Sequence, residues 1–425
     1  MATATAATTS VEDSSSTATK RGSNSASTKQ KVTANLYAKD LNGKDFKAPD
    51  YTIAELISVI PKDCFKRDLI KSLSFVFRDI FFMILFGYIA STYIPMIPSK
   101  TLRFFAWSTY CIVESFPMVG LWILAHECGH QAFSEYGWVN DFVGWILHSY
   151  TGNPYFSWKF SHRKHHQHTG HIDKDMVFVP KRTKDWKKSR GVMSLSELTA
   201  DSPLSSIWTL LIQQVVGFQT YLMIDATGQP HPELQDKWYQ QFFASHFNPV
   251  APIFDKGDFW FIIISDIGIA IVGYVVYQWI QIFGGFNCLV HWFIPYLLVN
   301  HWIVFLTFLQ HTDITLPHYE DNEWNFARGA AATIDREFGF VGWFFFHDII
   351  ETHVLHHYVS RIPFYNARKA TDAIKKFVGN DYRYSDENMF ITLWKSLRQC
   401  EFVEGNNGIL MYRNHNGFGA TPLDE

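Results

Sequence analysis

The chain has 425 residues, which is enough for one large domain or two, and it carries a formal net charge of −3. This charge offers no general attraction for nucleic acid, and five cysteines without paired spacing do not predict a disulfide framework. Aromatic residues make up 17% of the chain, which is high for a water-soluble protein, and the apolar residues are concentrated in a few windows.

The N-terminal segment is expected to be disordered. Residues 1–48 are rich in Ser, Thr and Ala, and such a tail cannot bury enough apolar surface to fold. The start of the chain contains no apolar stretch, so a secretory signal peptide is not predicted. Membrane insertion would then depend on segments within the remaining domain, residues 49–425.

Four windows are apolar enough to cross a bilayer, which needs roughly 20 residues of helix. Short connections join the first window to the second and the third to the fourth, so the four form two hairpins. The segments 126–258 and 311–415 then lie on one side of the membrane, and an excess of Lys and Arg in 156–190 assigns that side to the cytosol. The four windows cover about residues 73–97, 104–125, 259–282 and 289–310.

Two further segments are apolar or amphipathic. Residues 141–152 are too short to span a bilayer. Residues 204–224 are long enough, but a crossing there would place the histidines that follow on the opposite side of the membrane. Both segments are therefore predicted to be helices that lie at the membrane interface or pack beneath the cytosolic part.

Three clusters among the 19 histidines follow apolar segments closely. The clusters are HECGH at 126–130, HRKHH at 162–166 and HVLHH at 353–357. On a helix, the spacing i, i+3, i+4 of the last two clusters places their imidazoles on one face. Neutral imidazole is a common ligand of zinc, iron, copper and nickel, so the three clusters predict a metal site.

HECGH alone is typical of a zinc protease, in which two histidines and one more ligand hold a single zinc ion. That hypothesis leaves the other two clusters unexplained, because eight histidines are too many for one metal ion. A nitrogen-rich site for two metals beside lipid favours iron and oxygen chemistry. In that interpretation Glu127 accepts a hydrogen bond from a ligating imidazole and is not a proton shuttle.

The clusters resemble the three histidine boxes of the membrane fatty acid desaturases, and the methyl-end group of yeast and fungal type is the most similar. The resemblance covers roughly residues 50–415 and includes GWVNDFVGWILHS, TGHIDKDMVFVP and GAAATIDREFGF. It implies an all-α integral membrane protein. Four transmembrane helices in two hairpins would carry a cytosolic helical cap that holds a histidine-rich di-iron centre.

The resemblance also implies a ninth ligand, the histidine in LQHTD just after the fourth window. The implied set of metal ligands is His126, His130, His162, His165, His166, His311, His353, His356 and His357. Other polar residues nearby are either hydrogen-bond partners of these ligands or ordinary polar residues of the cap. They are His148, His168, His171, His318, His347, Asp348 and Glu351.

The implied activity is that of an acyl-lipid desaturase, which uses O2 and two electrons to insert a cis double bond near the methyl end of an 18-carbon unsaturated acyl chain. IPMIPSKTLRFFAWSTY and FDKGDFWFIIISDIGI resemble omega-3 members, so conversion of linoleate to α-linolenate is expected. Delta-12 desaturation of oleate to linoleate is the alternative. A hydroxylase or conjugase on the same frame and an intramembrane zinc protease also stay open.

The chain contains no haem-binding motif, no glycine-rich dinucleotide fingerprint and no cysteine cluster, so a separate protein is expected to supply the electrons. The resemblance implies cytochrome b5 and its NADH-dependent reductase, with a phospholipid-linked acyl substrate. The basic run 181–190 is interpreted as a docking surface for an acidic partner or for anionic lipid. The resemblance further implies the endoplasmic reticulum membrane, and the topology above places both termini in the cytosol. Oligomeric state is left open.

Overall fold

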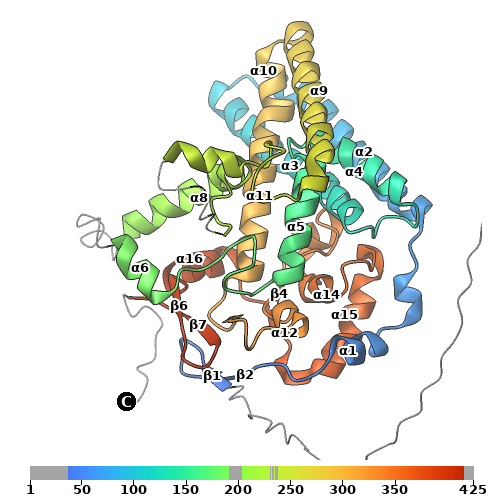
Figure 1. The fold of residues 1–425 in the computed structure, drawn as a ribbon. Helices are drawn as coiled ribbons and strands as arrows, with labels where there is room; N and C mark the ends of the chain where they lie inside the picture. The colour runs from blue at the N-terminus through green and yellow to red at the C-terminus, as the bar shows by residue number, and fades with distance from the viewer. Residues whose placement is uncertain (1–36, 191–202, 230, 232–233, 235–237, 416–425) are drawn as a thin grey trace, which may run out of the picture. The chain divides into compact units, whose positions relative to one another are not determined.

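The computed structural model describes residues 37–190, 203–229, 231, 234 and 238–415. Most of the tail predicted at 1–48 lies outside these residues, as do 191–202 and 416–425. The described chain is mainly helical (Figure 1).

Four long helices correspond to the four predicted windows. They are α2 (Leu69–Tyr93), α3 (Lys100–Gly129), α9 (Phe259–Phe283) and α11 (Ile294–His311), the last preceded by α10 (Gly285–Cys288) and the π-helical turn η5 (Leu289–Phe293). The helix α3 continues beyond its apolar window as far as Gly129, and the first histidine cluster lies in its last turn. The helix α11 ends at His311. Two of the four helices therefore carry histidines directly.

Five helices among the described residues are long and apolar enough to cross a membrane: the four above and Leu204–Ile224. The fifth corresponds to α8 (Pro203–Ile224), which the sequence predicts at the interface. In α3, 72% of the most apolar window is buried, whereas α2 and α9 each have 17% buried. The helix α3 is thus the central one, and it contacts α2, α4 and α11.

The remaining helices are shorter and surround the ends of α3 and α11. In Figure 1, α5, α12 and α14 lie below the pair formed by α9 and α11. The short helices are α1 (Ile53–Val59), α4 (Gly137–Tyr150), α5 (Tyr155–His168), α6 (Thr183–Arg190), α12 (Phe326–Ala330), α13 (Gly339–Phe344), α14 (His353–Tyr358), α15 (Phe364–Val378) and α16 (Met389–Gln399). Single 3-10 turns are η1 (Lys62–Phe65), η2 (Ile94–Met96), η3 (Trp238–Ala244), η4 (Lys256–Asp258) and η6 (Gly379–Asp381).

Within the described part of the chain, three small sheets are additions to the predicted all-α fold. Their strands are too short for an alternating pattern to be recognised in the sequence. An antiparallel sheet has the order β3-β7-β6, and β4 pairs in parallel with β5. The strands are β1 (Tyr37–Lys39), β2 (Asp45–Lys47), β3 (Pro317–Tyr319), β4 (Asp335–Arg336), β5 (Tyr384–Ser385), β6 (Phe402–Glu404) and β7 (Ile409–Arg413).

The antiparallel hairpin of β1 and β2 lies within the predicted tail, so the boundary at residue 48 was placed too late. The carboxylate of Asp40 accepts hydrogen bonds from the backbone of Asn42 and Lys44, each at 2.9 Å, and closes the turn. Phe46 is buried with Tyr319 and Met411. Asn407 and Arg413 also donate to the backbone of Tyr37 and Lys39, so the segment is held by residues far away in the sequence, which local composition could not reveal.

Close approach of α4 to α3 and α5 depends on Gly144. A Cβ atom there would lie 2.3 Å from the ring of Tyr155 and 2.9 Å from Cβ of Cys128. We expect Gly144→Ala to lower the free energy of unfolding by about 1–3 kcal/mol, because an overpacked core must shift. The thermal unfolding midpoint in detergent would report this. Gly273→Ala on α9, where no atom lies within 4 Å, is the control. Equal midpoints for the two variants would contradict this packing argument.

Candidate metal centre

The nine predicted ligands lie together, although four separate elements carry them. His126 and His130 come from the end of α3, the second cluster from α5, His311 from the end of α11 and the third cluster from α14. Their side-chain nitrogens form two groups that each lie within 4.8 Å. The first group is His126, His130, His162, His166 and His356, and the second is His165, His311 and His357. His353 joins the second group, with its Nε2 3.0 Å from Nε2 of His311.

Each HxxHH cluster is divided between the two groups. His162 and His166 belong to the first group and His165 to the second. His356 belongs to the first group and His357 to the second. Adjacent residues on a helix point about 100° apart, so neighbouring histidines reach different centres. The sequence predicted that the histidines of each cluster share one face of a helix. The structure corrects this, because each helix contributes histidines to both groups.

The donor set fits metal ions. The Nε2 atoms of His126 and His166 each lie 3.1 Å from Nε2 of His162, which cannot donate to both. The Nε2 atoms of His130, His356 and His357 are buried without a hydrogen-bond partner. Buried polar atoms are normally satisfied, and several convergent imidazole nitrogens are the donor set that iron or zinc accepts.

Burial keeps these imidazoles neutral. Withdrawal from water lowers the pKa of His130, His162, His166, His353, His356 and His357 well below its usual range, and neighbouring imidazoles add to the effect for all six. At neutral pH the rings are therefore unprotonated at one nitrogen each, which is the form that binds a metal ion.

Local structure fixes the direction of each cluster. The helix α3 ends at Gly129 with His130 as its C-cap residue, and Gln131 then adopts a positive φ of 60°. At the start of α14, the buried carboxylate of Asp335 accepts a hydrogen bond from Val354 N at 2.8 Å. Tyr382 donates to the other oxygen of Asp335 at 2.5 Å. The third cluster is thus fixed by residues outside its own helix.

Two residues that the sequence did not single out contact imidazoles of the second group. Asp175 Oδ1 lies 2.5 Å from His165 Nδ1, and its Oδ2 accepts from Gly170 N at 2.9 Å. Thr169 Oγ1 lies 3.1 Å from His357 Nδ1. A carboxylate behind a ligating imidazole fixes the ring and its tautomer. The sequence contains two aspartates in HIDKD, and only the turn after α5 decides that Asp175, not Asp173, faces His165.

Glu127 and the residues that the sequence left as either hydrogen-bond partners of the ligands or ordinary polar residues contact other groups. Glu127 Oε1 lies 3.5 Å from His126 Nδ1 without forming a hydrogen bond, and its Oε2 accepts from Phe364 N at 3.2 Å. Asp348 pairs with Arg368, and Glu351 accepts from Phe338 N. The five other histidines near the boxes lie as follows: His148 contacts Trp122 O and Asn153, His168 contacts Lys164 O, His171 contacts Asp321, His347 contacts Asp79, and His318 packs on Tyr412.

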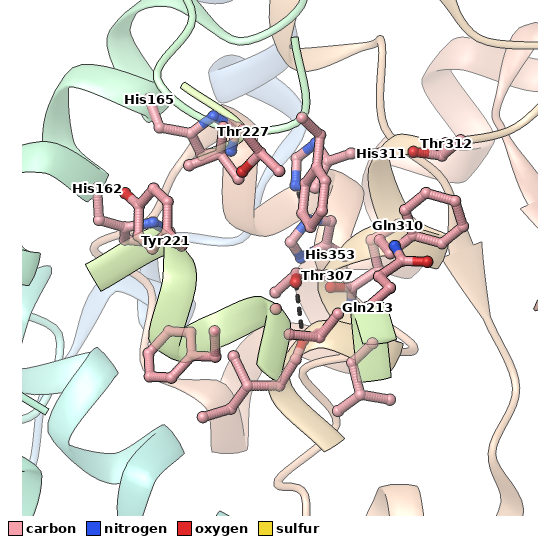
Figure 2. A pocket seen from close by; sticks show the side chains of 18 of the residues that line it. His162, His165, Gln213, Tyr221, Thr227, Thr307, Gln310, His311, Thr312 and His353 are labelled. Carbon is pink, nitrogen blue, oxygen red and sulfur yellow. Dashed lines mark hydrogen bonds between the residues drawn. The ribbon is translucent and has the colours of Figure 1, made fainter. Parts of the chain in front are cut away.

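A cavity of about 340 Å³ reaches the histidines from between α3, α8 and α11. Figure 2 shows His311 and His353 at its centre, with His162 and Tyr221 on one side and Gln310 on the other. Its lining is mainly apolar and includes Trp122, Trp158, Phe218, Val304 and Phe308. The cavity therefore suits an apolar ligand held against the histidine groups.

HECGH is one part of this larger site. His126 and His130 share their group with three histidines from the other two clusters. A zinc protease needs only one further ligand beside the two histidines of this motif, and it leaves the clustering of the other histidines unexplained. The geometry therefore does not support the zinc protease alternative.

Comparison with known proteins agrees with this geometry. The sequence model of the family described as fatty acid desaturase matches residues 103–387. An oleate hydroxylase of Claviceps purpurea is 42% identical over 408 residues, which cover 90% of this chain and 85% of the relative. A delta(12) fatty acid desaturase of Mortierella isabellina is 39% identical over 386 residues, covering 88% and 94%. An endoplasmic reticulum omega-6 fatty acid desaturase of Brassica juncea is 38% identical over 373 residues, covering 87% and 93%.

The chain therefore belongs to the fatty acid desaturase family, and it is a membrane-type oxidoreductase. The expectation of omega-3 regiochemistry is not supported. The relatives above carry delta-12, omega-6 or oleate hydroxylase names, and these favour the delta-12 alternative. The stretches that resembled omega-3 members, IPMIPSKTLRFFAWSTY and FDKGDFWFIIISDIGI, begin in the short connections before α3 and α9. None of their residues lines the cavity at the histidines, so they carry little information on regiochemistry.

The contact between Asp175 and His165 yields a test of the centre. We expect Asp175→Ala to weaken metal retention about 10–100-fold, because His165 loses the carboxylate that orients its ring. Metal content after dialysis against graded chelator, measured by mass spectrometry, would show the change. Asp173→Ala removes a neighbouring exposed carboxylate that pairs with Arg182 and serves as the control. Unchanged retention in the Asp175 variant would contradict an orienting role.

Proposed function

We propose that the protein is a delta-12 acyl-lipid desaturase that converts oleoyl to linoleoyl chains. The observation that carries this proposal is the apolar cavity, which is lined by His126, His162, His165, His311 and His353. An 18-carbon acyl chain is an apolar ligand, and the names of the relatives favour delta-12 chemistry.

Two iron ions are the proposed cofactor. The first group of five histidines would hold one ion, and His165, His311, His353 and His357 would hold the other. When bound, iron supplies the activation of O2 that is needed to remove hydrogen from an unactivated methylene, which no side-chain acid or base can do. The neutral, preorganised imidazoles support this assignment, since nitrogen ligands suit iron.

The chain's own contribution is to position the substrate and exclude water. Trp122, Trp158 and Phe218 form part of one apolar core and also line the cavity. Side chains fixed by core packing hold an acyl chain in one register, which selects the carbon atoms presented to the histidines. Asp175 and Thr169 keep the imidazoles of His165 and His357 in place while the substrate binds.

Hydroxylation of oleate is the second candidate. The relative from Claviceps purpurea is named an oleate hydroxylase and is 42% identical to this chain. A hydroxylase would use the same cavity and the same histidines on the same substrate. The two activities differ in whether the second hydrogen is removed or a hydroxyl group is delivered.

The proposed topology has four spans, α2, α3, α9 and α11, with α8 at the cytosolic interface. The second cluster precedes α8, whereas His311 and the third cluster follow α11. If α8 crossed as well as α9 and α11, the two sets would lie on opposite sides of the membrane, yet they lie in one site. In Figure 1, α8 lies to one side of α11, against which it packs. Both termini would be cytosolic, in the endoplasmic reticulum membrane.

Electrons are proposed to come from cytochrome b5 and its NADH-dependent reductase. In the basic run 181–190, Arg182 pairs with Asp173 and Glu320 and so stabilises the cap. Lys181, Lys184 and Lys187 are exposed and are the side chains offered to an acidic partner. Substitution of these three lysines separates a docking role from the structural role of Arg182.

Expression in a host that makes oleate but no polyunsaturated fatty acids tests the regiochemistry. We expect linoleate to appear without supplement, and no α-linolenate when linoleate is added, in profiles from gas chromatography and mass spectrometry. Hydroxylated oleate would favour the second candidate. α-Linolenate formed only from added linoleate would contradict the delta-12 assignment, and an unchanged profile with iron-loaded protein would contradict desaturation altogether.

Narrowing the cavity tests whether it holds the substrate. Thr307 on α11 lines the cavity, so Thr307→Phe should obstruct the acyl chain and lower product formation at least about tenfold, the loss expected from a small misplacement of substrate. Iron content should stay at the wild-type level. Thr220→Phe makes the same change on α8 at a residue that does not line the cavity. Full activity in Thr307→Phe would place the substrate elsewhere.

A further inference from the structure

A buried carboxylate on α2 is the main charged feature that the proposed function leaves unexplained. Asp79 is 0% exposed, although only 17% of the most apolar window of its helix is buried. A carboxylate withdrawn from water costs several kcal/mol unless charged or polar groups pair with it. Its partners therefore indicate what the buried charge does.

Arg78 and His347 are these partners. The Arg78 guanidinium donates from Nε and Nη2 to Asp79 Oδ1 at 2.9 and 2.7 Å, and His347 Nε2 lies 2.9 Å from Asp79 Oδ2. Arg78 Nη2 also lies 3.5 Å from His347 Nδ1. Because guanidinium only donates, Nδ1 is the acceptor, which makes Nε2 the donor to Asp79. Arg78 and His347 thus both donate to the carboxylate of Asp79, one to each oxygen.

The surrounding packing leaves this group little freedom. A Cβ atom at Gly120 of α3 would lie 2.5 Å from Asp79 Oδ2 and 2.7 Å from the carbonyl oxygen of Phe345. The rings of Phe75 and Phe364 lie 5.6 and 4.6 Å from that of His347. The imidazole of His347 is therefore held by hydrogen bonds and by two aromatic neighbours at once.

His347 begins the segment that leads into the third histidine cluster. His347 and Asp348 have φ angles of 51° and 60°, in the left-handed region that residues other than glycine rarely adopt. Two consecutive residues of this kind persist only where their surroundings hold them. Asp79 supplies such a restraint for His347, and Arg368 does so for Asp348 through a 2.6 Å ion pair.

Hydrogen bonds continue from this segment into α14. Thr352 Oγ1 donates to the carbonyl of Asp348 at 2.8 Å, and Thr352 is the residue at which α14 begins. The carbonyl of Thr352 accepts from His356 N at 3.0 Å. A continuous set of contacts therefore leads from Asp79, through His347, to the backbone that carries His353 and His356.

We propose that Asp79 is a positioning residue for the third histidine cluster, which it holds in register with the other two by binding His347. This inference rests on the proposed iron-binding function. Helix α2 then does more than anchor the chain in the membrane. Its buried Asp79 fixes the proposed ligands of α14, which lie far from α2 in the sequence.

The test measures the retention of iron in purified protein in detergent. Asp79→Ala removes both contacts, whereas Asp79→Asn keeps the size and one acceptor oxygen. We expect the rate of iron release to a chelator to rise about 10–100-fold in Asp79→Ala, the range for lost partners of metal ligands, and to rise less in Asp79→Asn. If the alanine variant does not accumulate as folded protein, the asparagine variant decides.

Asp266 on α9 provides the matched control, because its Oδ1 is also buried but has no hydrogen-bond partner. Asp266→Ala and Asp266→Asn should release iron at the wild-type rate. Wild-type release rates in both Asp79 variants, or a lower thermal midpoint without faster release, would overturn the positioning role. Faster iron release in the Asp266 variants as well would mean that the loss of any buried carboxylate speeds release, and it would overturn the specific role of Asp79. Wild-type protein that binds no iron would instead overturn the proposed function itself.

Discussion

The enclosure of nine imidazoles in one region is the constraint on which the rest of the described structure depends. Ring nitrogens approach one another to 3.0–3.1 Å, and several are buried without a hydrogen-bond partner. A buried polar atom left unsatisfied costs about 1–3 kcal/mol. Such a set must therefore be held by contacts elsewhere or by bound cations.

Helices α3 and α11 connect the histidine groups to the apolar part of the chain. Each is long and apolar enough to cross a membrane, and each ends in ligands of the proposed centre. Their shared core, together with α8, also forms the wall of the cavity. The histidine groups and the apolar cavity are therefore parts of one packed unit, because the same helices supply both.

The carboxylates that contact the imidazoles or the backbone beside them come from widely separated parts of the chain. Asp175 follows α5 by a tight turn, Asp335 lies on a two-residue strand and Asp79 lies on a predicted membrane helix. Each carboxylate is buried, and each bonds to an imidazole or to the backbone beside one. Asp79 acts on the third histidine cluster indirectly, through His347. The positions of the imidazoles thus depend on buried carboxylates, and these hydrogen bonds compensate the cost of burying them.

The sequence by itself predicted the four long apolar helices and the three histidine clusters, because apolar length and histidine spacing are local properties. Its resemblance to the membrane desaturases added His311 and the class of chemistry. The sequence missed the hairpin at 37–47 and the division of each cluster between two groups, and its lean towards omega-3 is not supported. Only the tertiary structure decided which carboxylates orient the ligands. Asp79 and His347 are 268 positions apart, and Glu127 meets Phe364 across 237. Such pairings depend on how helices pack, and no local pattern in the sequence encodes them.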